Sequence, residues 1–193
     1  MGVNLTPIVE KRVISFDDLR ERSLVVDGFV VLHQFLALIR ARDGQPLMDF
    51  RGRTTSRLIG LIFRTTRLIA DHGMRPAFVF DGRPPHIKRV EIEKRKEIRK
   101  RFEEEYGEAV SAGDYADAMH KAMMTGHLIS EGIADAKRFL ELLGIPWGQA
   151  LSEGEAQAAY MTAKGDAWAT NSQDYDSLLI GTPRARLAWR RLS

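Results

Sequence analysis

The sequence predicts an α/β fold in which a mostly parallel, twisted sheet is flanked by helices. Two observations support this prediction. Short runs of β-branched or aromatic residues alternate with long segments of helical pattern, which is the order of βαβ units. In addition, acidic residues directly follow several of the apolar runs, and parallel sheets bind their ligands at the carboxyl ends of the strands.

Four elements before residue 84 are expected to form the first part of the sheet and its crossover. In order, they are a strand at 24–26, helices near 30–40 and near 54–71, and a strand at 76–80. Gly73 ends the second helix, and Pro76 starts the next strand. Asp27 closes the first strand and Asp81 closes the second, so both carboxylates should reach the same edge of a parallel sheet.

Residues 84–143 follow a different pattern. Pro84 and Pro85 break the chain, a highly charged helix is expected over 86–105, and one or two further helices are expected over 114–143. We expect this helical insertion to project from the domain rather than to join its core. The later elements are a strand at 145–147, a helix at 153–164, an apolar run at 167–170 and a strand near 187–191.

The composition limits the classes of function. The 193 residues include 44% hydrophobic residues, which is typical of a folded domain, and carry a formal charge of +3. There is no cysteine, which excludes disulfides, thiolate catalysis and cysteine-rich zinc sites and fits an intracellular protein. No apolar run approaches the roughly 20 residues of a membrane span, so no membrane partner is expected.

Six carboxylates stand where strands end or helices begin, and they are the strongest functional signal. They are Asp27, Asp81, Glu153, Glu155, Asp174 and Asp176. Oxygen ligands of this kind suit Mg²⁺ or Mn²⁺, and two such ions can support the displacement at a phosphodiester. The alternative is helix capping, with Ser152 and Glu155 as a capping box and Asp174 as the N-cap of a helix at 175–180. One metal site accounts for all six acids, whereas capping needs a separate explanation for each group.

Basic residues follow Asp81 on the expected charged helix. Lys88 and Arg95 lie two turns apart on one helix face, which suits contact with a scissile phosphate. The alternative is a solvated helix held by i,i+4 pairs such as Glu91–Arg95. Further candidates for phosphate contact, which could equally be ordinary surface arginines, are Arg40, Arg64 and Arg67.

Three strings resemble a known family, the structure-specific 5′ nucleases, and in particular the flap endonucleases of archaea and eukaryotes. They are VFDGRPP at 79–85, SEGEA at 152–156 and SQDYDSLL at 172–179, and the resemblance extends over essentially the whole chain. It implies a PIN-like nuclease domain that cuts 5′ DNA flaps, and also acts as a 5′ exonuclease, in replication and repair. Such an enzyme would lie in the cytoplasm of an archaeon or the nucleus of a eukaryote.

The resemblance also implies roles for individual residues. Two Mg²⁺ ions, which Mn²⁺ can replace, would be held by the six acids: Asp27, Asp81, Glu153 and Glu155 serve the first ion, and Glu155 with Asp174 and Asp176 serves the second. Lys88 and Arg95 would approach the scissile phosphate, and 84–143 would be the helical arch that admits the flap. Gly2 would lie near the duplex junction.

Two features depart from the family pattern. His33 stands where relatives carry a tyrosine that stacks on a base, and imidazole offers less area for stacking. The chain ends at Ser193, so the resemblance implies that another active-site aspartate, the duplex-binding region and the sliding-clamp peptide are absent. The alternatives are therefore a catalytically impaired DNA-binding fragment and a PIN-type ribonuclease.

Overall fold

The computed structural model describes residues 7–42, 44–51, 53–85, 88, 93–94, 97, 100, 105, 127–172 and 175–187. Within these ranges five strands form one sheet in the order β3-β2-β1-β4-β5, and every neighbouring pair is parallel. The strands are β1 (Ser23–Asp27), β2 (Arg75–Phe80), β3 (Trp147–Gln149), β4 (Ala169–Ser172) and β5 (Ala185–Leu187). The predicted mostly parallel sheet is therefore confirmed.

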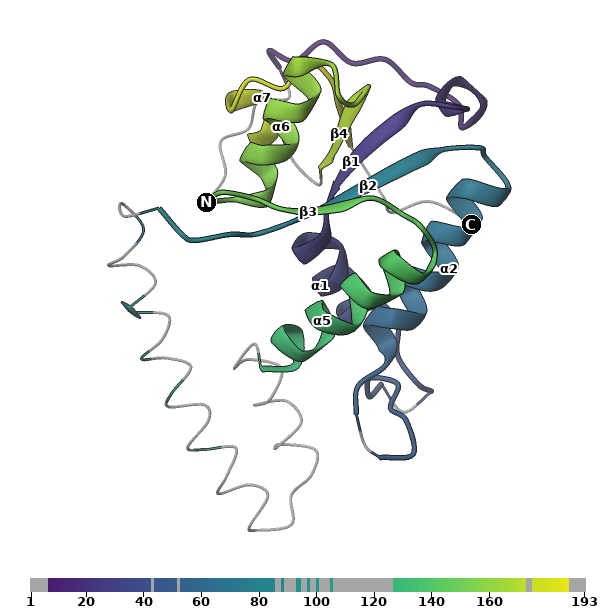
Figure 1. Cartoon of the computed structure of the whole chain (residues 1–193), viewed down its shortest axis with the longest axis vertical. Coiled ribbons are helices and arrows are strands. Elements are labelled where there is room, and N and C mark those ends of the chain that lie inside the picture. The colour runs from purple at the N-terminus through teal and green to yellow at the C-terminus, as the bar shows by residue number, and fades with distance from the viewer. Residues whose placement is uncertain are drawn as a thin grey trace.

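The described helices cover both faces of the sheet (Figure 1). On one face lie α1 (Gly28–Leu38), α2 (Ser56–Ala70) and α5 (His127–Leu142), which pack against one another. On the other face α6 (Gly154–Lys164) packs on β1, β2 and β4, and α7 (Asp176–Leu179) packs on α6. A short 3-10 helix, η1 (Asp17–Leu19), precedes β1.

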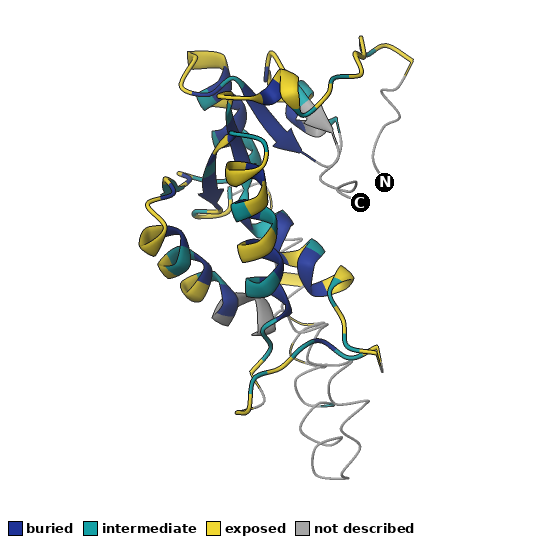
Figure 2. Cartoon of the chain, turned by 90° about the vertical axis from the view of Figure 1, so that its right-hand side faces the viewer, coloured by how far each residue is buried: buried dark blue, intermediate teal, exposed yellow. Residues whose placement is uncertain are grey.

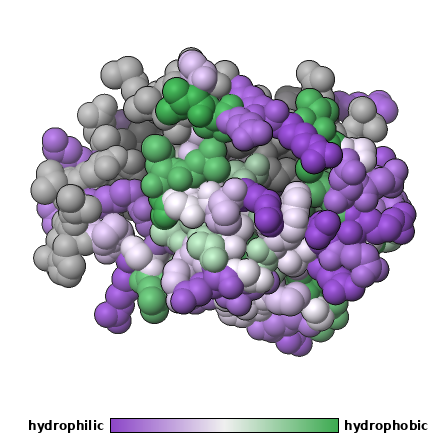
Figure 3. Space-filling view, turned by 90° about the horizontal axis from the view of Figure 1, so that it is seen from above, coloured by the Kyte–Doolittle hydropathy of each residue, from purple (hydrophilic) through white to green (hydrophobic). Residues whose placement is uncertain are grey.

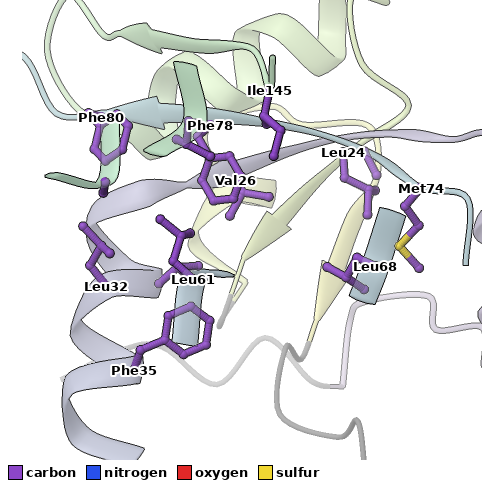
Figure 4. Close-up of a cluster of buried hydrophobic side chains, with 14 of the residues drawn as sticks. Leu24, Val26, Leu32, Phe35, Leu61, Leu68, Met74, Phe78, Phe80 and Ile145 are labelled. Carbon is purple, nitrogen blue, oxygen red and sulfur yellow. The ribbon is translucent and has the colours of Figure 1, made fainter. Parts of the chain in front are cut away.

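The core consists of two layers, one on each face of the sheet. Side chains alternate along a strand, so Leu24 and Val26 join the larger cluster with α1, α2 and α5, whereas Val25 joins the smaller cluster with α6. Figure 4 shows the larger cluster, in which Phe78 and Phe80 of β2 lie above the helices. Burying a side chain of this size stabilises the fold by about 1.5–3 kcal/mol. The strands β1, β2 and β4 are accordingly buried over most of their length, as the dark central layer of Figure 2 shows.

Close contact between α1 and α2 depends on a glycine. A Cβ placed at Gly60 would lie 2.4 Å from Cγ of Phe35, so a larger residue would push the two helices apart. The contact holds α1 in place, and α1 in turn begins directly at the end of β1. The packing of this helix pair therefore helps to fix the strand end at Asp27.

The expected insertion over 84–143 is wrong in its carboxyl part. α5 lies in the core, with Ala136 and Leu140 fully buried. Its apolar residues Ile133, Ala136 and Leu140 recur at helical spacing and form a stripe that needs a partner, which α1 and α2 supply. Of the charged helix expected over 86–105, residues 88, 93–94, 97, 100 and 105 have helical conformation, and the other residues from 86 to 126 lie outside the described residues.

One predicted strand is displaced along the sequence: the strand expected at 145–147 lies at Trp147–Gln149. The strand expected near 187–191 overlaps β5 at Leu187, where β5 forms an edge of the described sheet, and residues 188–191 lie outside the described residues. Pro146 explains the shift of β3, because its carbonyl still accepts a bond from the N–H of Phe78 while its own nitrogen has no hydrogen to donate. In the described parts of the chain, no helix has the length and apolar character that crossing a bilayer would require.

Candidate active site

The candidate site lies where the order of the strands reverses. β1, β2 and β3 follow one another toward one side of the sheet, whereas β4 and β5 lie on the other side of β1. In open parallel sheets the ligand binds at the carboxyl ends of the strands next to such a reversal. β1 ends there with Asp27, β2 is followed by Asp81, and β4 ends with Ser172. The sequence predicted this edge correctly for the first two acids.

Asp27 caps a helix and carries a carboxyl group with a raised pKa. Its Oδ1 accepts a hydrogen bond from the N–H of Val30 at 3.0 Å, so it is the N-cap of α1. Burial raises the pKa of Asp27 to about 6, and the negative charges of Asp81 and Glu155 also raise it, although backbone N–H groups act in the opposite direction. A carboxylate is thus held in a place where its charge is unfavourable without a cation.

Asp81 is fixed from the opposite face of the sheet. Its Oδ1 accepts a hydrogen bond from the N–H of Gly154 at 2.7 Å, at the N-terminus of α6. A Cβ placed at Gly154 would lie 3.1 Å from Oδ1 of Asp81 and 3.4 Å from Oδ2 of Asp27. The two carboxylates therefore converge on one point at the start of α6, although they are far apart in the sequence.

The capping-box alternative for residues 152–155 is wrong. The N-cap of α6 is Glu153 rather than Ser152, and the Glu153 side chain makes no capping bond. Instead, Oε1 of Glu153 pairs with the ammonium of Lys88. Oε1 of Glu155 accepts a hydrogen bond at 2.9 Å from the hydroxyl of Ser172, the last residue of β4. Tertiary contacts thus take the place of the local cap.

The donors present are chemically suited to a divalent cation. Carboxylate oxygens are the preferred ligands of Mg²⁺ and Mn²⁺, and a cation between Asp27 and Asp81 would offset the burial and the repulsion that raise the pKa of Asp27. Asp174 and the side chain of Asp176 lie outside the described residues. Among the residues that are described, no group of three or more acids or histidines forms a complete metal cluster. The structure brings Asp27 and Asp81 together, while their role as metal ligands and the site of six acids stay predictions.

Four of the five predicted DNA contacts are described, and all four lie on α1 or α2 or directly after α1. His33 is exposed on α1, with its ring 4.7 Å from that of Phe29. Arg40 donates to the carbonyl groups of Ala37 and Gly44 at 3.2 and 3.1 Å, so it closes the loop that follows α1. Gly2 and Arg95 lie outside the described residues, and for them the prediction is not tested.

Two of the predicted arginines line a groove between α1 and α2 of about 270 Å³. Arg64 and Arg67 form its charged end, and burial together with the charge of Arg67 lowers the pKa of Arg64. Arg67 also pairs with Asp71 at 3.3 Å. The other lining residues are Phe35, Leu38, Ile39, Ile59, Gly60 and Phe63. This groove lies on the face of the sheet away from α6, so the arginines are not part of the carboxylate site.

Three residues near the carboxylates were missed in the sequence. Ser172 and Gln149 are the last residues of β4 and β3, so the rule that polar residues at strand ends mark the site could have found both. Lys137 on α5 gives no such signal, because it reaches Gln149 only through the tertiary fold.

Seen from the α6 side, the surface carries both hydrophilic and hydrophobic groups (Figure 3). The exposed apolar residues of α6, α7 and the turns beside them include Leu151, Leu179 and Ile180.

Comparison with protein families gives two matches. Residues 1–102 match the XPG N-terminal domain, and residues 144–188 match the XPG I-region. A curated relative, flap endonuclease 1 of Staphylothermus marinus, is 52% identical over 188 residues. The match covers 95% of this chain and 53% of the relative, so the chain spans about half the length of the curated relatives it matches.

Solved structures agree with this result. The flap endonuclease-1 of Methanococcus jannaschii is similar with a TM-score of 0.69 and 38% sequence identity, over 95% of this chain and 58% of that one. The catalytic core of Rad2, solved in complex with a DNA substrate, is similar with a TM-score of 0.64 and 25% identity. That match covers 94% of this chain and 48% of the Rad2 chain.

Proposed function

This chain belongs to the family of proteins that carry the XPG N-terminal domain, and from that premise we propose that it is the nuclease domain of a structure-specific 5′ nuclease. The proposed reaction is divalent-metal-dependent hydrolysis of a phosphodiester near a 5′ DNA flap, together with 5′ exonuclease activity. The proposed cofactor is a pair of Mg²⁺ ions, which Mn²⁺ can replace. The proposed place of action is inside the cell, during replication and repair.

One observation carries this proposal: Asp27 and Asp81 converge at the start of α6, at the reversal of the strand order. When bound, divalent ions would activate a water molecule and neutralise charge on the phosphate. The chain itself holds the carboxylates in place before any ligand arrives. Val30 fixes Asp27, Gly154 fixes Asp81, and Ser172 fixes Glu155.

Lys88 supports a phosphate site beside the acids. Its ammonium is about half exposed and already pairs with Glu153, so a positive charge lies next to the candidate ligands. A phosphate that approached the site could exchange for Glu153 as the partner of Lys88, which would leave Glu153 available to the ion. A cation positioned where negative charge develops stabilises the transition state of phosphoryl transfer.

Branched DNA with a 5′ flap is the proposed substrate, and the DNA substrate in the complex of the similar Rad2 core supports DNA as the partner. A sliding clamp is the other proposed partner. The clamp would bind a segment that lies in the half of the full-length relatives that this chain does not match. A DNA-binding fragment with impaired catalysis is a second candidate, because the chain spans about half of its relatives.

The test is cleavage of a labelled flap substrate in Mg²⁺ by the 193-residue chain and by a version extended to the length of its relatives. Binding of the same DNA is measured separately, and an RNA flap of equal sequence is assayed in parallel. Asp81→Ala should abolish cleavage by the extended version and leave binding nearly unchanged, whereas Asp135→Asn, which removes an exposed acid of α5, should leave both unchanged.

Each outcome has a distinct meaning. Cleavage of DNA flaps that needs Asp81 supports the proposed nuclease. Binding without cleavage by the 193-residue chain alone supports the second candidate for this chain. Cleavage of RNA in preference to DNA would replace the proposal with a PIN-type ribonuclease, and cleavage that survives Asp81→Ala would remove the assignment of the site.

A further inference from the structure

A lysine on α5 reaches the end of the sheet that carries Asp81. The Lys137 ammonium donates a hydrogen bond at 2.6 Å to Oε1 of Gln149. It also lies over two aromatic rings, 4.7 Å from the centroid of Trp147 and 5.2 Å from that of Phe80. Cation–π contacts at these distances are attractive, so Lys137 is held in place by three neighbours.

Gln149, which accepts the bond from Lys137, in turn donates a hydrogen bond to Asp81. It is the last residue of β3 and lies opposite Phe80 in the register of β2 and β3. Its side-chain Nε2 donates to the main-chain carbonyl of Asp81. An ammonium has only donors, so Lys137 fixes the amide with Oε1 toward itself and directs Nε2 toward Asp81. A side chain thus continues the hydrogen bonding between β2 and β3 beyond the last paired residues.

The backbone on both sides of Asp81 is already fixed by other contacts. The carbonyl of Phe80 accepts from the N–H of Ala150 at 2.8 Å, and the N–H of Gly82 donates to the carbonyl of Ser152 at 2.6 Å. A Cβ placed at Gly82 would lie 1.9 Å from the Ala150 carbonyl oxygen, which shows how closely the segments approach. The Gln149 amide therefore gives a second anchor to the peptide between Asp81 and Gly82, whose N–H already donates to Ser152. This peptide and the one before it set the direction of the Asp81 side chain.

We propose that Lys137 and Gln149 are positioning residues that fix the peptide of Asp81, and that they couple α5 to the metal site. The inference rests on the proposed function, because it takes Asp81 as a metal ligand. Partners that orient a metal ligand without touching the metal change metal affinity by about 10–100-fold when they are removed. Gln149 bonds the main-chain carbonyl of Asp81 and Lys137 bonds Gln149, so the effect of both residues on the site passes through Asp81.

The test measures Mn²⁺ binding by the 193-residue chain with isothermal titration calorimetry. Asp81→Asn defines the part of the binding that depends on Asp81. Gln149→Met keeps the length of the side chain and removes both polar contacts, and it should weaken that part by about 10-fold or more. Lys137→Met should weaken it in the same direction, and Lys137→Arg should restore it. Lys164→Met is the matched control, because it removes one positive charge and one ring contact at the far end of α6.

Two further measurements separate positioning from a general loss of structure. Combining Lys137→Met with Gln149→Met should weaken Mn²⁺ binding no more than Gln149→Met alone, since Lys137 acts through Gln149. Hydrogen exchange of the Gly82 amide in EDTA should become faster in Gln149→Met and stay unchanged in Lys164→Met, while the melting temperatures of both stay close to that of the parent.

The outcomes distinguish this inference from the proposed function. Absence of Asp81-dependent Mn²⁺ binding in the parent chain would overturn the proposed function. Normal Mn²⁺ affinity in Gln149→Met, with Asp81-dependent binding present in the parent, would overturn the positioning role of Gln149. Additive losses in the double variant would overturn the action of Lys137 through Gln149.

Discussion

Replacing Asp27 with asparagine should stabilise the metal-free protein and remove its response to metal. Asparagine keeps a side-chain oxygen that can accept the Val30 N–H, so the cap of α1 is retained. The charge is lost, and with it the repulsion from Asp81 and Glu155 and the cost of burial. One substitution thus separates the structural function of residue 27 from its proposed function as a ligand.

The magnitude follows from the raised pKa. The pKa of Asp27 rises from 3.8 to about 6 in the folded protein, so the folded state holds the proton more tightly than the unfolded state. The contribution of Asp27 to stability is therefore complete below 3.8 and is lost as the pH rises through 6. The full shift corresponds to about 3 kcal/mol, and partial exposure to water reduces the expected effect to about 1–3 kcal/mol.

Thermal unfolding in EDTA tests this expectation. At about pH 8 the free energy of unfolding of the variant should exceed that of the parent by about 1–3 kcal/mol. Each kcal/mol should raise the melting temperature by about 2–4 °C. Below about pH 4 both chains carry a neutral group at residue 27, and the difference should vanish. Addition of Mg²⁺ should raise the melting temperature of the parent and have little effect on the variant.

Two results would refute this reasoning. If the variant melts below the parent in EDTA at neutral pH, Asp27 is not the unfavourable charge that its surroundings indicate. If Mg²⁺ stabilises the two proteins equally, residue 27 is not a ligand. Asp166→Asn, which removes an exposed acid beside the carboxyl end of α6, serves as the control and should shift neither comparison.

Three other changes have definite expected results. Gly82→Ala should lower the free energy of unfolding by about 3 kcal/mol or more in urea titrations, because the new Cβ would lie 1.9 Å from the Ala150 carbonyl oxygen, and a cost below about 1 kcal/mol would contradict the close approach. Lys88→Met should slow flap cleavage in single-turnover assays while changing stability by less than about 1 kcal/mol, because its ion pair with Glu153 is exposed; an effect on DNA affinity alone would assign Lys88 to the solvated surface. His33→Tyr should tighten flap binding in fluorescence anisotropy without a change in melting temperature, because the exposed ring gains stacking area, and an unchanged Kd would remove His33 from the DNA contacts.

Strand-end chemistry is the part of the site that the sequence predicted well. The apolar runs before Asp27 and Asp81 are local signals, and the geometry of a parallel sheet brings their ends to one edge. The helices near 30–40 and 54–71 could be predicted because their helical patterns are also local signals. For these strands and helices the signal lies in neighbouring residues, and prediction and structure agree closely.

The remaining features depend on contacts between distant segments. Ser152 and Glu155 have the spacing of a capping box, yet Asp81, which follows β2, accepts a hydrogen bond from the first N–H of α6 and makes the local cap unnecessary. α5 was assigned to a projecting insertion, because the sequence does not show that α1 and α2 leave an apolar face for Ala136 and Leu140. No local pattern predicts that a helix residue such as Lys137 will orient a strand residue.

The central position of β1 determines when the site can form during synthesis. β1 lies between β2 and β4, and Leu24 pairs on one side with Pro76 and on the other with Ala169. A nascent chain that has emerged only as far as residue 150 contains Asp27 and Asp81 but lacks the Gly154 amide, the Glu155 carboxylate and the strand that completes the ladder of β1. Pairing across so many residues must also overcome a large loop-closure entropy. Pairing of β1 with β2 can bring Asp27 and Asp81 to one edge early, but the Gly154 amide that fixes Asp81 and the Glu155 carboxylate join them only after the segment that ends with β4 has been synthesised.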